Sequence, residues 1–167
     1  MLFFELFIQF SAPVLLLLNV RFDVIENKKI INGLKIAIAS TFIAHGLFAM
    51  GLIYLPGHFV DMTIIILDVN EAQATSFLYI VGLLDIVASI MIFIPKLSKY
   101  ALLYMIYWGF STAFARLMSG YSQNFMASSI HGSLYLVIYR LSHGIVPLLV
   151  LIIEEKLKKL KLPTNEI

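Results

Sequence analysis

The sequence predicts an all-α integral membrane protein: a single helical bundle with about five transmembrane helices and additional short interfacial helices. Of its 167 residues, 60% are hydrophobic and only 13% are charged, which is about half the charged share of a typical soluble domain. Apolar stretches of the length that crosses a bilayer, about 20 residues, recur along the chain. The basic residues gather in alternate connections, as the positive-inside rule requires. We expect one bundle over residues 1–162 and a cytoplasmic tail over residues 163–167.

Five apolar segments are long enough to cross a membrane. The first segment has neither a basic start nor a small-residue cleavage site after it, so we expect a retained spanning helix rather than a signal peptide. The five segments cover residues 2–20, 34–55, 76–94, 100–118 and, roughly, 136–153.

The distribution of Lys and Arg predicts the orientation of the bundle. The connections 56–75 and 119–133 carry neither residue, which indicates that they lie outside the cytoplasm. We therefore expect the N-terminus outside and the C-terminus inside, in the cytoplasmic membrane of a bacterium. Because topology accounts for the basic residues, no nucleic-acid partner is predicted. The three basic clusters are Arg21, Lys28, Lys29 and Lys35; Lys96 and Lys99; and Lys156, Lys158, Lys159 and Lys161.

The second connection contains helical signals of its own. Residues 58–69 are largely apolar but too few to span a bilayer, which predicts an interfacial or re-entrant helix. Asn70, with Gln73 three residues later, has the pattern of a capped helix start. The third spanning helix should therefore begin near Glu71 and end at Pro95.

The last third of the chain is expected to form two helices. A short outer helix over residues 125–139 precedes the fifth crossing. Arg140, His143 and Pro147 are expected to line up on the fifth helix, because their spacing is close to helical.

Small residues beside the polar ones predict close helix packing. Gly82 shares a helix face with Asp85 in the third segment. In the second segment, Gly46 and Gly51 are both interpreted as packing glycines.

Ionisable residues are scarce inside the apolar segments, and any chemistry of the protein depends on them. Placing such a charge against lipid costs roughly 2.5–3.5 kcal/mol even on the lenient insertion scale, so these side chains should face a shared interior. With the predicted orientation, all of them lie between the membrane midplane and the outer face. We therefore predict a buried polar pocket that opens to the outer side. Its candidate residues are Glu5, His45, Asp85, Arg116, Arg140 and His143.

Two interpretations of these charges remain open. Glu5 and Asp85 formally balance Arg116 and Arg140, so the four residues could form an ion-pair core that only sets helix packing. We favour a ligand-binding or proton-transfer site, because ionisable residues within a membrane are functional by default. Two arginines in one pocket suit an anionic or carbonyl-bearing ligand, since each guanidinium presents paired donors.

The histidines raise the question of a metal or haem. Imidazole ligates zinc, copper and haem iron, so His45 and His143 could hold a haem, or a lone metal together with Asp85. However, no two residues on one helix have a metal-binding spacing, and the chain has no cysteine. We therefore expect histidines that are hydrogen-bonded or transfer protons, and no metal site. No nucleophile or nucleotide-binding motif occurs, which leaves open whether the protein is an enzyme.

Residues 33–51, GLKIAIASTFIAHGLFAMG, resemble the start of DoxX-like membrane proteins, where an apolar helix ends in an Ala-His-Gly-Leu pattern. Residues 81–95, VGLLDIVASIMIFIP, are similar to the Gly-x-Leu-acid helix of that family. The resemblance covers roughly residues 33–118. It implies a small helical bundle of a kind often accessory to oxidoreductases; one namesake is a subunit of a thiosulfate:quinone oxidoreductase. It also implies that His45 and Asp85 occupy the polar positions of the family, with Asp85 standing where Glu is common.

We expect a DoxX-like protein that supports a membrane redox step near a quinone. The basic residues of the pocket would bind or protonate a carbonyl-bearing ligand, its carboxylates would orient them or relay protons, and Tyr107 and Trp108 could pack on a ring. One alternative is a non-catalytic subunit of a larger membrane complex, whose buried charges only lock the helices. A second is a small transporter or proton path, against which the absence of inverted repeats argues. The expected partners are the lipid bilayer and either other membrane subunits or further copies of the chain.

Overall fold

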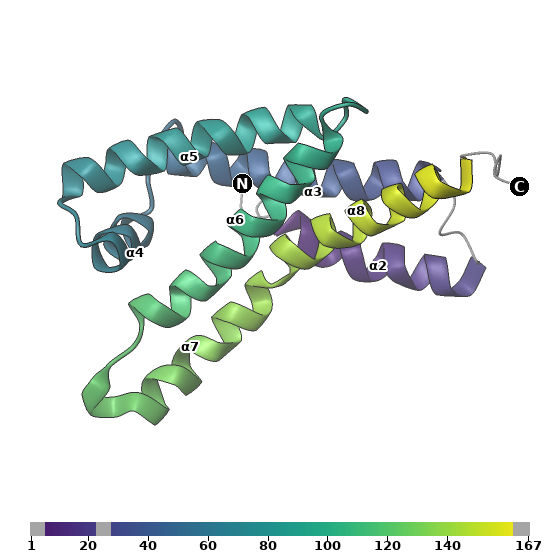
Figure 1. The fold of residues 1–167 in the computed structure, drawn as a ribbon. Coiled ribbons are helices and arrows are strands. Elements are labelled where there is room, and N and C mark those ends of the chain that lie inside the picture. Colours follow the sequence, from purple (N-terminus) through teal and green to yellow (C-terminus); the bar gives the residue numbers. More distant parts are fainter. Residues whose placement is uncertain (1–5, 23–27, 162–167) are drawn as a thin grey trace, which may run out of the picture.

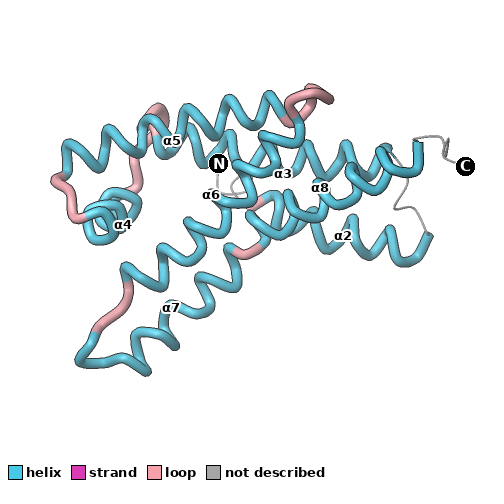
Figure 2. The backbone as a smooth tube through the Cα atoms, viewed as in Figure 1, coloured by secondary structure: helices cyan, strands magenta, loops and turns pink. Residues whose placement is uncertain are grey.

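The computed structural model describes residues 6–22 and 28–161, which form helices joined by short connections (Figures 1 and 2). Within these residues the predicted all-α class is confirmed, since they contain no strand. In chain order the elements are α2 (Phe7–Phe22), α3 (Lys28–Ala49), α4 (Gly57–Leu67), α5 (Glu71–Met91), α6 (Ser98–Ser119), η1 (Gln123–Phe125), α7 (Met126–Arg140) and α8 (Ser142–Lys161).

Three helical stretches of the described residues are long and apolar enough to cross a membrane: Lys28–Ala49, Glu71–Met91 and Gln123–Lys159. The chain is therefore suited to membrane integration. The fifth-helix prediction over residues 136–153 falls within the third stretch. The other two predicted crossings and the orientation stay predictions, and the start of the first segment and the tail over 163–167 lie outside the described residues.

The helical signals of the second connection are confirmed. Helix α4 occupies Gly57–Leu67, close to the predicted 58–69. The Asn70 side chain accepts a hydrogen bond from the Gln73 amide at 2.9 Å, and the Gln73 side chain accepts one from the Asn70 amide at 3.1 Å. Helix α5 therefore starts at Glu71, as predicted. It ends at Met91, four residues before Pro95, because Pro95 has no N–H to donate to the Met91 carbonyl.

The predicted bounds of the second spanning helix, 34–55, are wrong at both ends. Helix α3 runs from Lys28 to Ala49 and stops at a glycine turn. Gly51 has a φ of 70°, and the amides of Gly51 and Leu52 donate back to the carbonyls of Phe48 and Leu47 at 3.0 and 3.1 Å. This is the hydrogen-bond pattern of a Schellman motif. Gly51 is therefore a helix-ending residue, not the packing glycine that was predicted.

The last third of the chain contains the two predicted helices, with a different boundary. The expected outer helix corresponds to α7, but α7 continues to Arg140 and α8 starts only at Ser142. Arg140 and His143 therefore lie on two successive helices, and the prediction that both belong to the fifth helix is wrong. The interruption at Leu141 coincides with no Pro or Gly, so the sequence carried no signal for it.

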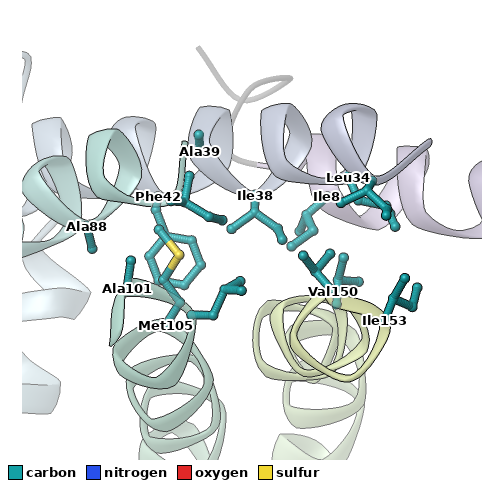
Figure 3. Close-up of a cluster of buried hydrophobic side chains, with 14 residues drawn as sticks. Ile8, Leu34, Ile38, Ala39, Phe42, Ala88, Ala101, Met105, Val150 and Ile153 are labelled. Carbon is teal, nitrogen blue, oxygen red and sulfur yellow. The ribbon is translucent and has the colours of Figure 1, made fainter. Parts of the chain in front are cut away.

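The main core lies where α3 packs against α2, α6 and α8 (Figure 3). Ile38 and Phe42 of α3 meet Met105 of α6, Val150 of α8 and Ile8 of α2. Because lipid is as apolar as these side chains, they stabilise a membrane bundle through van der Waals packing rather than through removal from water. A second cluster joins α3, α4 and α5 near the other end of α3; it consists of Phe48, Ala49, Phe59, Leu78 and Val81.

Glycines allow two pairs of helices to approach closely. A Cβ on Gly46 of α3 would lie 2.5 Å from the carbonyl oxygen of Gly82 of α5, and a Cβ on Gly82 would lie 2.7 Å from that of Gly46. A Cβ on Gly109 of α6 would lie 2.5 Å from the His143 carbonyl of α8. The pairs α3–α5 and α6–α8 are thus closely packed, and α6 with α7 diverges from α4 and α5 toward one end of the molecule (Figure 1).

Candidate functional site

A cavity of about 840 Å³ lies between α4 and α5 on one side and α6 on the other. Residues of α3 and the end of α7 complete its wall. This volume is within the 300–1,000 Å³ usual for small-molecule sites. Four of the six predicted site residues line it, and each comes from a different helix: His45, Asp85, Arg116 and Arg140.

His45 and Arg140 are in direct contact at the cavity wall. The Arg140 guanidinium, at the end of α7, donates a hydrogen bond from Nη1 to Nε2 of His45 in α3. Because a guanidinium can only donate, this ring nitrogen carries no proton, and the neutral imidazole has its proton on Nδ1. The positively charged guanidinium therefore lies against the lone pair of His45 Nε2. Both residues line the same cavity.

His143 lies beside this pair. Its ring centroid is 5.1 Å from that of His45, and its Nδ1 donates to the backbone carbonyl of Arg140 at 3.1 Å. The side chain is buried, and its Nε2 has no hydrogen-bond partner among the described residues. His143 is not one of the residues that line the cavity, so it adjoins the site through its contacts with His45 and Arg140.

Asp85 is held by a tyrosine from the neighbouring helix. The Tyr104 hydroxyl of α6 donates to the Asp85 carboxylate at 2.8 Å, and the Asp85 residue is only 3% exposed. The ion-pair alternative also involves Glu5, which lies outside the described residues, so that alternative stays a prediction. Tyr104 was not among the predicted site residues, and its role as the partner of Asp85 was missed.

The two remaining predicted site residues are Arg116 and Glu5. Arg116, in the last turn of α6, lines the same cavity and is partly buried. Glu5 lies outside the described residues. Gln9 of α2, a further polar residue in the first segment, donates to the carbonyl of Tyr139 at 3.1 Å and thereby ties α2 to the end of α7.

Most of the cavity wall is apolar and aromatic. Tyr107 and Trp108 line it, as expected from the sequence, and Phe59 of α4 and Phe77 of α5 contribute from the other side. Trp108 is the single tryptophan of the chain, and its ring packs edge to face on Phe77 with centroids 6.2 Å apart. A planar ring in the cavity would therefore meet aromatic faces and, at the most buried positions, hydrogen-bonding groups.

The metal and haem alternatives gain no support from this geometry. Within the part of the chain that the structure describes, no three His, Cys, Asp or Glu side chains are placed to share a metal ion. A site made of His45, His143 and Asp85 is therefore not formed. Haem ligation by both histidines would require Nε2 of His45, which accepts the hydrogen bond from Arg140.

A second buried polar cluster, which sequence reasoning missed, lies at the opposite end of α3. The Lys35 ammonium contacts Glu154 of α8 at 2.5 Å, the carbonyl of Ile92 at 2.8 Å and the hydroxyl of Ser98 at 3.0 Å. The Ser98 hydroxyl in turn donates to Glu154 at 3.0 Å. Lys35 was counted only among the basic residues that set topology. Its isolation within the apolar run from Ile30 onward was the available signal that it needs a partner.

Comparison of the chain with protein-family models, with curated proteins and with solved structures gives no match. The DoxX-like resemblance therefore remains a prediction from residues 33–118.

Proposed function

We propose that the protein binds a quinone-like ligand in this cavity and thereby supports a redox step in the cytoplasmic membrane of a bacterium. The observation that carries the proposal is the combination of a largely apolar, aromatic cavity with a few convergent polar groups, which is the composition of small-molecule sites. His45, Asp85 and Arg140 are its polar groups from α3, α5 and α7.

Each polar group has a distinct role in this proposal. Arg140 donates to a carbonyl or anionic oxygen of the ligand, since it lines the cavity and a guanidinium presents several N–H donors in a fixed fork. Asp85, hydrogen-bonded to Tyr104, accepts from or exchanges a proton with a ligand hydroxyl. Reduction of a quinone to its quinol takes up two electrons and two protons; a partner oxidoreductase supplies the electrons, so this chain acts as the accessory, ligand-holding subunit.

The alternative of a purely structural subunit is weaker at the cavity. Buried charges that serve only to lock helices are expected to be satisfied within the bundle, as those of Lys35 and Glu154 are. The cavity residues Asp85 and Arg140 also have partners within the bundle, but in addition they border a volume of about 840 Å³. A transporter or proton path has no feature of the described residues in its favour.

The test uses the single tryptophan as a probe of the cavity. Purified protein in detergent is titrated with a quinone analogue, while Trp108 fluorescence and the thermal unfolding midpoint are followed. We expect saturable quenching and a raised midpoint. Arg140→Met should weaken binding by about tenfold or more, because a hydrogen bond to a charged group contributes roughly 1.5–3 kcal/mol.

The control for this variant is Lys99→Met, which removes an exposed charge from the first turn of α6, outside the cavity. It should bind like the wild type. Absence of quenching in the wild type, or equal affinity in Arg140→Met, would contradict the proposal.

A further inference from the structure

We infer that the cavity opens sideways into the bilayer and that its ligand is a long-chain amphiphile, which enters from the lipid with its polar head toward His45, Asp85 and Arg140 and its chain along α6. This inference rests on the proposed function. It adds to that function an entry route and a requirement for an acyl or isoprenoid chain on the ligand.

One row of α6 side chains both lines the cavity and faces the outside. Leu103, Tyr107, Phe114 and Met118 are all cavity residues, and their exposed fractions are 45%, 76%, 51% and 62%. Their spacing along the chain is three to four residues or a sum of such steps, so they share one helix face. This row, called the α6 stripe below, forms an edge of the cavity mouth.

The length of the α6 stripe indicates where the mouth opens. From Leu103 to Met118 the helix rises about 22 Å at 1.5 Å per residue, whereas the hydrocarbon core of a bilayer is about 30 Å thick. If α6 crosses the membrane as predicted, a mouth of this length cannot be confined to one aqueous surface. Most of it must border lipid.

The chemistry of the mouth agrees with a lipid border. The α6 stripe contains no charged side chain, and the opposite wall is formed by α4 residues that are equally apolar, including Met62, Ile66 and Leu67. An exposed apolar strip of this kind is unusual in contact with water and marks a ligand or membrane surface. A water-soluble anion would enter past these residues at a desolvation cost, whereas an alkyl chain matches them.

The two ends of the cavity differ in burial, which orients the ligand. Asp85 and Arg140 are 3% and 9% exposed, so they are much more buried than the α6 stripe. The buried end therefore suits a polar head group, and the volume of about 840 Å³ suits a small molecule rather than a transmembrane helix of a partner protein. We therefore assign the cavity to a small amphiphile rather than to a second copy of the chain.

The test compares three quinone analogues that share one head group and carry no chain, a ten-carbon chain or a long isoprenoid chain. Dissociation constants are measured by Trp108 quenching and expressed as mole fractions in the micelle, so that partitioning alone produces no gain. We expect both chain-bearing analogues to bind at least about fivefold more tightly than the bare head.

Filling the cavity with a larger side chain should abolish the tighter binding of the chain-bearing analogues. Ala115→Phe places a large side chain on the cavity wall and should reduce the gain to less than about twofold. The matched control is Ala127→Phe, at an exposed position of α7 outside the cavity, which should keep the full gain. If Ala115→Phe does not fold, Met118→Gln serves instead, since Met118 is exposed and lines the mouth.

The outcomes separate the inference from the proposed function. If the bare head binds as tightly as the chain-bearing analogues and still requires Arg140, the inference is overturned and the proposed function stands. If no analogue of any chain length binds, both are overturned. Tyr107→Cys introduces the only cysteine of the chain. Rapid disulfide dimerisation of this variant in native membranes, unaffected by the ligand, would show that a second copy covers the mouth and would also overturn the inference.

Discussion

Lys35 and His45 lie ten residues apart on α3, and the two ends of the bundle that they occupy differ in how polar groups are satisfied. At the Lys35 end, the ammonium has three acceptors: the Ile92 carbonyl, the Ser98 hydroxyl and the Glu154 carboxylate. The Ser98 hydroxyl also donates to Glu154, which completes the network. At the His45 end, polar groups from several helices border a cavity, and the nearby His143 Nε2 has no partner among the described residues.

This difference separates two uses of buried charge in a membrane bundle. An ammonium has three donors, and Lys35 has an acceptor for each, so its cluster has nothing left to offer a ligand. It joins α3 to α8, to the first residue of α6 and to the end of α5, where the Ile92 carbonyl accepts a hydrogen bond from the Lys35 ammonium. The His45 end presents hydrogen-bonding groups to a cavity, which is an arrangement typical of small-molecule sites.

The largest effect on stability is expected at the Lys35 end. Lys35→Met leaves the partly buried Glu154 carboxylate, 17% exposed, without its cation, so the loss of unfolding free energy should approach the value of about 3–5 kcal/mol for a fully buried pair. Denaturant titration in mild detergent measures this loss. The double variant Lys35→Met with Glu154→Met should recover most of it, because two apolar residues replace the pair; failure to recover would show that the pair is more than a structural link.

A smaller effect is expected at the glycine crossing next to His45. Gly46→Ala places a methyl group 2.5 Å from the Gly82 carbonyl oxygen, and overpacking of this kind costs about 1–3 kcal/mol. The matched control is Gly132→Ala, within α7, where a Cβ meets nothing within 4 Å. The control should be stabilised by up to about 1 kcal/mol, since alanine favours the helix. Equal unfolding free energies for the two variants would argue against the close α3–α5 crossing.

Removal of the hydrogen bond to Asp85 should have a still smaller effect. Tyr104→Phe deletes the hydroxyl that donates to the carboxylate and keeps the ring in the core. Hydrogen bonds between helices in membranes contribute about 0.5–1.5 kcal/mol, so the unfolding free energy should fall by that amount. A loss several times larger would indicate that the Asp85 carboxylate cannot stay buried without this hydrogen bond.

No measurable effect is expected from the exposed ion pair. Lys99 contacts Glu155 at 3.0 Å, but both side chains are exposed, and exposed pairs contribute little because water and salt screen them. Lys99→Ala should leave the thermal midpoint unchanged within error. A clear decrease would mean that ion pairs at this end stabilise the bundle regardless of burial, which would weaken the contrast with Lys35.

The sequence predicted those features that depend on local chemistry. The capping box at Asn70 and Gln73 placed the start of α5 correctly, and the length of the apolar stretch 58–69 predicted α4. The high cost of charge in lipid predicted that His45, Asp85, Arg116 and Arg140 share an interior, and all four line one cavity.

Features that depend on tertiary geometry could not be predicted in this way. Gly46 and Gly51 look alike in the sequence, yet Gly46 packs against Gly82 and Gly51 ends α3. The pairing of Asp85 with Tyr104, and of Lys35 with Glu154, depends on the rotation of each helix about its axis. Apolar periodicity specifies that rotation poorly when lipid and protein surroundings are both apolar.

The most direct test of the contrast between the two ends measures ligand-induced stabilisation in two variants, Lys35→Met and Arg140→Met. The thermal midpoint of each is recorded with and without a ten-carbon quinone analogue, beside the wild type. We expect Lys35→Met to have the lower midpoint and to keep the full ligand-induced increase, and Arg140→Met to lose that increase. If both variants keep the increase, or if Lys35→Met alone loses it, the assignment of one end to structure and the other to ligand binding is wrong.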